Sequence, residues 1–223
     1  NGTTYVRCAA LGFQTLYNNT ANDNTGLGFQ AMVANTTGSN NTAVGSQALD
    51  ANTTGANNVA VGQNSLGANT TASNNTGVGY NALAVNTTGT QNNAIGTNAL
   101  DACTTGERNQ AMGYNALGSL TTGIRNVAIG NDAMNASNGD RNVAIGEQAL
   151  YNSAASDMVG VGNKALLANT TGASNTAVGA NALDANTTAS YNTAVGKDAL
   201  GANTTASNNT DCGDRSLYTN TTG

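Results

Sequence analysis

Residues 41–57 read NTAVGSQALDANTTGAN, and residues 58–74 read NVAVGQNSLGANTTASN. Both follow the template N-[TV]-A-[VI]-G-x-x-A-[LM]-x-A-N-T-T-[GA]-x-N, with Ser65 in place of one alanine. The same template continues outward to both ends of the 223-residue chain. The glycine after the Val or Ile anchors each unit, and positions below are counted from it. The thirteen anchors are Gly12, Gly28, Gly45, Gly62, Gly79, Gly96, Gly113, Gly130, Gly146, Gly162, Gly179, Gly196 and Gly213.

The spacing of the anchors predicts the fold. Successive anchors are 17 residues apart, or 16 at the first interval and at the two intervals between Gly130 and Gly162. A unit rich in Gly, Thr and Asn is a poor helix former, and helix-pair repeats need about 33 to 45 residues. The segments N-T-A-V and A-L-x-A instead read as short strands separated by turns. We therefore predict an all-β parallel β-solenoid of 13 coils, which forms a single repeat domain over 1–223 with no linker.

Two apolar ladders run through the repeat, at position −1 (Val or Ile) and at position +4 (Leu or Met). We expect both to fill the interior of the coil, and the anchor glycines to permit its sharp corners. Alanine at position −2 alternates with the Val ladder, so we expect it to point outward and to form a packing surface for another chain. The predicted structural residues are Val44, Val61, Val78, Ile95, Leu49, Leu66, Leu83, Leu100, Gly45, Gly62, Gly79 and Gly96.

Asparagine recurs at positions −4 and +7, where stacked amides can donate and accept hydrogen bonds along the solenoid. The second set also begins the N-x-[ST] pattern of N-glycosylation. Two interpretations stay open: the asparagines are structural ladder residues, or they carry glycans. The candidate glycosylation sites are Asn35, Asn52, Asn69, Asn86, Asn169, Asn186, Asn203 and Asn220.

The composition excludes several classes of function. The chain contains no His, Pro or Trp, only 9% of its residues are charged, and its net charge is -5. Without histidine there is no imidazole base and no histidine-ligated zinc, so we predict no enzyme, no catalytic or metal site and no cofactor. The acidic balance argues against a nucleic-acid partner. No apolar run is long enough to cross a bilayer, which argues against membrane insertion.

Three cysteines, Cys8, Cys103 and Cys212, lack the C-x-x-C spacing of zinc and redox sites. They fall in coils one, six and thirteen, too far apart for a bridge within one straight solenoid. A head-to-tail stack would bring Cys212 of one copy near Cys8 of the next, which makes these two a candidate intersubunit disulfide. The alternative is that all three are small fillers of Asn or Val positions.

The words NTAVG, VAIG and GxxAL, as in NTAVGSQALDANTTG and NVAIGEQAL, carry a family resemblance. They resemble the β-roll repeats of trimeric autotransporter adhesin heads. They are still more similar to the NTAVGxxAL arrays of phage tail-fibre-like and bacterial surface fibre proteins. The resemblance covers essentially the whole chain. It implies a β-roll or β-solenoid in an extracellular, cell-surface or virion fibre, often trimeric and without enzymatic activity.

We therefore expect a structural fibre shaft that associates with itself, as a head-to-tail filament or a homotrimer, and that is adhesive if it contacts a cell-surface glycan. The alternative is a ligand-binding solenoid. Repeated Thr-Thr pairs suggest ice binding, although they supply at most one outward file of hydroxyls. Aromatic residues after the anchor (Phe13, Phe29, Tyr80 and Tyr114) suggest stacking on a glycan, but the stripe is broken. Isolated carboxylates fit neither known calcium motif.

Overall fold

The computed structural model describes residues 7–221, which fold into two compact units, with unit 1 ending at Arg108 and unit 2 beginning at Asn109. Each repeat contributes one strand of three residues. Unit 1 contains Ala9–Leu11 (β1), Thr25–Leu27 (β2), Thr42–Val44 (β3), Val59–Val61 (β4), Thr76–Val78 (β5) and Asn93–Ile95 (β6). Unit 2 contains Gln110–Met112 (β7), Val127–Ile129 (β8), Val143–Ile145 (β9), Val159–Val161 (β10), Thr176–Val178 (β11), Thr193–Val195 (β12) and Thr210–Cys212 (β13).

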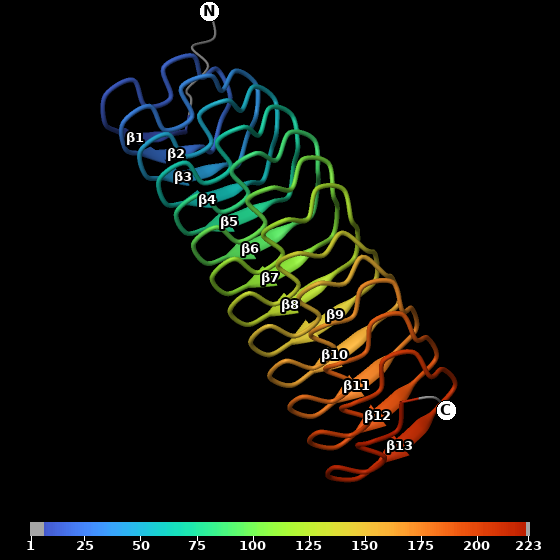
Figure 1. Ribbon diagram of the computed structural model, residues 1–223. Coiled ribbons are helices and arrows are strands. Elements are labelled where there is room, and N and C mark those ends of the chain that lie inside the picture. The colour runs from blue at the N-terminus through green and yellow to red at the C-terminus, as the bar shows by residue number, and fades with distance from the viewer. Residues whose placement is uncertain (1–6, 222–223) are drawn as a thin grey trace, which may run out of the picture. The chain divides into compact units, whose positions relative to one another are not determined.

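Within each unit the strands lie side by side in chain order, and the rest of each repeat loops around behind them (Figure 1). Within each unit, neighbouring strands pair in parallel and align equal positions of successive repeats, such as Thr42 with Val59 and Val44 with Val61. Pairing also extends beyond the strands, because Leu49 donates its N–H to the carbonyl of Ser65 at 3.0 Å. The predicted all-β parallel solenoid with one coil per repeat is therefore confirmed.

The inner and outer faces of the strands are the reverse of the prediction. Alanine at position −2 is fully buried, as in Ala43, Ala60 and Ala128, whereas Ile129 and Ile145 at position −1 are each 39% exposed. The interior behind the strand is narrow because the Leu ladder already occupies it. A Cβ added to Gly160, at position −2, would lie 3.1 Å from Cγ of Leu150. Only Ala or Gly fits there, so the larger Val and Ile side chains must face outward.

The correction applies to the four outer residues Val44, Val61, Val78 and Ile95, which are half-buried or exposed. The second predicted ladder is correct: Leu49, Leu66, Leu83 and Leu100 are fully buried. These leucines do not belong to a strand, as the A-L-x-A segment is a turn. Gln47 and Leu49 both adopt left-handed φ values, 57° and 54°, which are unfavourable for such side chains. Their N–H groups then donate to opposite neighbouring coils, Gln47 to Phe29 and Leu49 to Ser65.

The anchor glycines are required by the backbone. Gly45, Gly62, Gly79 and Gly96 have φ between 131° and 140°, a region that other residues rarely adopt. A Cβ on Gly45 would also lie 2.5 Å from the carbonyl oxygen of Gly62 in the next coil. Within a unit, the N–H of an anchor donates to the carbonyl of the residue before the previous anchor, as Gly62 does to Val44 at 2.7 Å. A residue larger than glycine would clash with the next coil at this position. Glycine therefore lets the chain turn away from the strand while successive coils stay in contact.

We expect inner and outer positions of one coil to differ in their contribution to stability. Leu183 is fully buried and Val178, five residues earlier, is 36% exposed. Leu183→Ala should lower the free energy of unfolding by about 2–5 kcal/mol through loss of packing and the resulting cavity. Val178→Ala should cost about 1 kcal/mol or less. Urea denaturation followed by circular dichroism, at dilutions where the protein is monomeric, measures both. Equal losses would contradict the assignment of the two faces.

Candidate functional site

Asparagine at position −4 forms a buried ladder in which one side chain serves two coils. Asn58 is fully buried, and its Oδ1 accepts the backbone N–H of Asn75 in the next coil at 3.0 Å. The backbone N–H of Asn58 donates in the same way to Oδ1 of Asn41 at 2.9 Å. Its Nδ2 donates to the carbonyl of Ala72 at 2.9 Å. Both halves of the amide are thus satisfied inside the protein, as a buried polar group requires.

Asparagine at position +7 forms a second ladder, parallel to the first. Nδ2 of Asn52 donates to Oδ1 of Asn35 at 2.7 Å and to the carbonyl of Gly55 at 3.0 Å. Oδ1 of Asn52 accepts from Nδ2 of Asn69 at 3.0 Å. The carbonyl of Gly55 also accepts from Nδ2 of Asn41, in the first ladder, at 2.8 Å. In this coil the two ladders therefore meet at one backbone oxygen, and the links connect side chains that are fully buried.

The second ladder is interrupted where other residues take position +7: Cys103, Leu120, Ser137 and Ser153. Cys103 points its thiol at the carbonyl of Gly106, 3.8 Å away, and Oδ1 of Asn86 is left buried without a hydrogen-bond partner. Oγ of Ser137 is also buried without a partner. Cys103 and Ser137 thus leave local polar defects. Ser153 does not, because its Oγ accepts from Nδ2 of Asn169 at 3.1 Å and so takes the place of an asparagine oxygen.

The candidate glycosylation sites are largely contradicted by this burial. Seven of them have no exposed surface, and glycosylation would need to replace a hydrogen on the same Nδ2 that holds the ladder together. These seven are Asn35, Asn52, Asn69, Asn86, Asn169, Asn186 and Asn203. Asn220 is half-buried, and no structural finding tests it. Three other N-x-T asparagines, Asn40, Asn74 and Asn208, are exposed at the corner before the strand.

Asn52→Ala should destabilise the first unit, because Oδ1 of Asn35 loses its donor while it remains buried. An orphaned buried acceptor costs roughly 1–3 kcal/mol. Thr54→Ala is the matched control, since Thr54 is exposed two residues later. Thermal melting of both variants gives the comparison. A loss for Thr54→Ala as large as that for Asn52→Ala would show that the ladder has no special role.

The three cysteines are free, with Cys103 buried and the other two exposed. Strand pairing aligns Leu11 with Leu27 and Val195 with Cys212. A copy stacked in the same register would therefore place Leu11 against Cys212. Cys8 lies three residues before Leu11, about 10 Å along an extended chain, whereas a disulfide needs Cα atoms within about 7 Å. The register disfavours the predicted Cys8 to Cys212 disulfide, which stays a prediction that would need a shifted stack.

Burial raises the pKa of the Cys103 thiol to about 11, so only about a thousandth of it is thiolate at pH 8. The raised pKa keeps the group protonated until the pH approaches that value. We expect maleimide at pH 8 to label Cys8 and Cys212 in the native protein, and all three cysteines in denaturant. Mass spectrometry of labelled peptides counts them, with Cys103→Ser as the control. Rapid native labelling of Cys103 would contradict its burial.

The outer face of the sheet in unit 2 carries a group of neighbouring apolar side chains that are exposed or half-buried. On β8, β9 and β10 both outward positions are Val or Ile, so six β-branched side chains face away from the interior. The six are Val127, Ile129, Val143, Ile145, Val159 and Val161. The sequence signal that identifies this face is the alternation of side-chain direction along the strand. Counted from the buried asparagine at position −4, every second side chain points inward, so those at positions −3 and −1 point outward.

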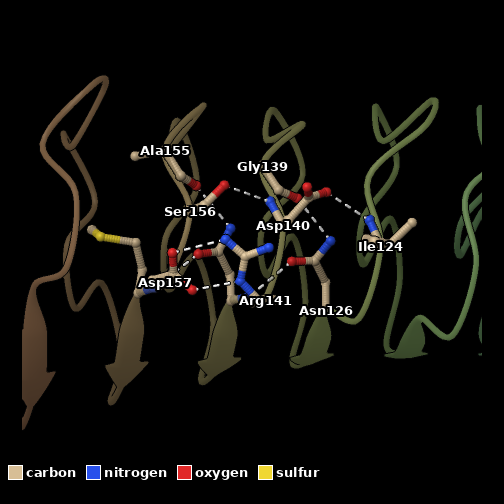
Figure 2. Close-up of polar contacts among 10 residues, drawn as sticks. Ile124, Asn126, Gly139, Asp140, Arg141, Ala155, Ser156 and Asp157 are labelled. Atoms are coloured by element: carbon tan, nitrogen blue, oxygen red, sulfur yellow. Dashed lines mark hydrogen bonds and ion pairs between the residues drawn. The ribbon is translucent and has the colours of Figure 1, made fainter.

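Charged residues border this apolar face at the corner before each strand. Figure 2 shows Arg141, which donates from Nε and Nη2 to the two carboxylate oxygens of Asp157, at 2.6 and 2.9 Å. These hydrogen bonds lower the pKa of Asp157. Beside them, Asp140 accepts the backbone N–H of Ile124 at 2.9 Å and donates its own N–H to Oγ of Ser156 at 3.0 Å. The corner is thus held by polar links between successive coils.

The threonine and aromatic columns bear on the ligand-binding alternative. In each N-T-T the first threonine hydroxyl donates to the next coil, as Thr36 does to the carbonyl of Thr53 at 2.9 Å. The second threonine is exposed and forms a single file, with members Thr37, Thr54, Thr71, Thr88 and Thr105 in unit 1. Phe13 and Phe29 stack on one another, with ring centroids 5.7 Å apart. The hydroxyl groups of the first threonines are therefore used in hydrogen bonds between coils of the solenoid.

The carboxylates at position +5 are half-buried, and this burial raises the pKa of Asp50, Asp101 and Asp184. Across residues 7–221, no group of three or more Cys, Asp or Glu side chains is placed to hold a metal ion. The same part of the chain contains no helix with the length and apolar character to cross a bilayer. Comparison with protein-family models, curated proteins and solved structures gives no match to this chain.

Proposed function

We propose that this chain is a segment of a structural fibre shaft, located outside the cell, on the cell surface or on a virion, which assembles with other copies of itself. The proposal includes no enzymatic activity and no cofactor. Its adhesive role, if a cell-surface glycan is bound, belongs to the same proposal. The observation that carries it is the exposed apolar outer face of the parallel sheet.

A parallel sheet with Val and Ile on its outer face favours a covering layer. Parallel strands in soluble proteins are usually covered on both faces, and a contiguous exposed apolar patch marks an interaction site. Here Ile129 and Ile145 are each 39% exposed, and nothing in the described chain packs over them. Another copy of the chain offers files of side chains with the same spacing, about 4.8 Å from coil to coil. Association of two copies would therefore cover the apolar side chains of this face in unit 2.

The interior of the solenoid supports a shaft for a different reason. Buried asparagine ladders and backbone hydrogen bonds connect each coil only to its neighbours, so repeats add length without changing the cross-section. The side chains that face solvent vary more from coil to coil than those inside. Such a molecule supplies distance and stiffness, which are the properties of a spacer.

Sideways assembly is favoured over head-to-tail stacking. At position −2 of β13, where other strands carry Ala or Gly, the chain has Asp211. Asp211 is 5% exposed, and its Oδ2 has no hydrogen-bond partner. A further coil stacked on β13 would bury this carboxylate completely, at a large cost in desolvation. The apolar outer face has no such obstacle.

The assembly is tested by placing a charge in the middle of the apolar face. Wild-type protein at micromolar concentration should sediment as an oligomer. Ile145→Lys should dissociate it, because association would bury the ammonium group against apolar side chains. We expect at least about a tenfold weaker association, measured by analytical ultracentrifugation. The fold should survive because Ile145 points outward.

Thr171→Lys is the control, since it adds the same charge at an exposed position away from the sheet. It should leave the association unchanged, and circular dichroism should show that both variants remain folded. A stable wild-type monomer at these concentrations would defeat the proposed assembly.

A further inference from the structure

The three strands of unit 2 with Val or Ile at both outward positions, β8, β9 and β10, are also the three in that unit that have a charged residue near each end. Two residues before each strand lies Arg125, Arg141 or Asp157. Two or three residues after each strand lies the second charged residue, Asp132 for β8, Glu147 for β9 and Lys164 for β10. The signs are opposite on every strand: basic then acidic on β8 and β9, and acidic then basic on β10.

This pattern matters for two copies that pack through their outer faces. If the two solenoid axes point the same way, facing strands run in opposite directions, and the start of one strand lies over the end of its partner. With equal coils at equal height, Arg125 faces the second copy's Asp132, Arg141 faces its Glu147, and Asp157 faces its Lys164. All three levels then join opposite charges across an interface whose centre is Val and Ile.

When the two solenoid axes point in opposite directions, fewer charged residues face a residue of opposite sign. A reversed pair centred on β9 places Arg141 against Arg141 and Glu147 against Glu147, and both contacts are repulsive. A reversed pair centred between β9 and β10 matches those two strands, but it sets Arg125 opposite the uncharged Ser174 before β11. Only the arrangement with axes in the same direction pairs all six charges and covers all six Val and Ile side chains with one another.

We propose that neighbouring copies of this chain pack through β8–β10 with their solenoid axes pointing the same way and with equal coils at equal height. The inference rests on the proposed self-assembly and adds its direction and register. The two copies are then related by a two-fold axis parallel to the solenoid axes, so the assembly is a closed pair with a defined polarity.

The bordering charges remain available for such contacts. The side chains of Arg141 and Asp157 pair with each other but are 48% and 50% exposed. Glu147 is exposed and accepts one hydrogen bond, from Nδ2 of Asn163 at 3.2 Å. Asp132 accepts from Nδ2 of Asn135 at 3.0 Å and from Nδ2 of Asn131 at 3.3 Å. A carboxylate can accept further donors beyond these.

The chain itself supplies the variants for a charge swap. Position −5, before β10, already holds Asp157, and position +2, after it, already holds Lys164, both with left-handed φ. Arg125→Asp and Asp132→Lys therefore place on β8 residues that the same positions accept on β10. Each single variant makes the β8 level like-charged, and the double variant restores opposite signs.

We expect each single variant to weaken association about threefold to tenfold at low ionic strength, and the double variant to return within about twofold of wild type. Half-molar salt should reduce these differences. Sedimentation equilibrium measures all four proteins, with circular dichroism to confirm folding. Ser174→Asp is the control and should have no effect, because Ala180 and Asn181 face it in the proposed arrangement.

The outcomes separate the two proposals. A monomeric wild type overturns self-assembly and this inference together. A wild type that associates while the single variants bind as well as it does overturns the direction and register alone. Stronger association of Ser174→Asp would indicate the reversed pair centred between β9 and β10, and would likewise overturn the inference.

Discussion

The hydrogen bond from the backbone N–H of one buried asparagine to the side-chain oxygen of the asparagine one coil earlier determines much of this structure. It recurs through both units, as between Asn58 and Asn41 and between Asn142 and Asn126, each at 2.9 Å. A side chain that accepts here must point inward. Alternation along the strand then places position −2 inside and positions −3 and −1 outside. The inward orientation of this one side chain therefore decides which residues of the repeat lie in the core, at the corners and on the surface.

The same orientation explains why the interior is lined by small and polar groups. A coil with one three-residue strand and tight turns encloses little space, and the Leu and Met ladder fills most of it. Alanine fits beside that ladder, and the amides satisfy carbonyls that the turns leave without strand partners. Burial of asparagine is stabilising here because the hydrogen bonds of the amides are met, and the unpaired oxygen of Asn86 beside Cys103 shows the exception.

Periodicity in the sequence was sufficient to predict the solenoid, the coil length, the anchor glycines and the buried leucines. It failed at Val44 and Ala43, because hydrophobic size suggested that valine is inside. The deciding information, the width of the coil, depends on where the chain returns behind the strand. It failed likewise at Asn52, since an N-x-T match does not report burial. The outer cluster on β8–β10 could have been found by reading parity from the asparagine at position −4.

The coils of 16 residues show where this architecture accepts a change in length. Between Gly130 and Gly146, and again between Gly146 and Gly162, the missing residue is the second, exposed threonine of N-T-T. The first ladder still connects the coils, because the N–H of Asn142 donates to Oδ1 of Asn126 and the N–H of Met158 donates to Oδ1 of Asn142, each at 2.9 Å. The perimeter of a coil is therefore adjustable at one corner, independently of the rise along the axis. A peptide inserted at that corner would project from its coil at a known position along the solenoid axis. The repeat could therefore serve as a scaffold that displays peptides at regular intervals.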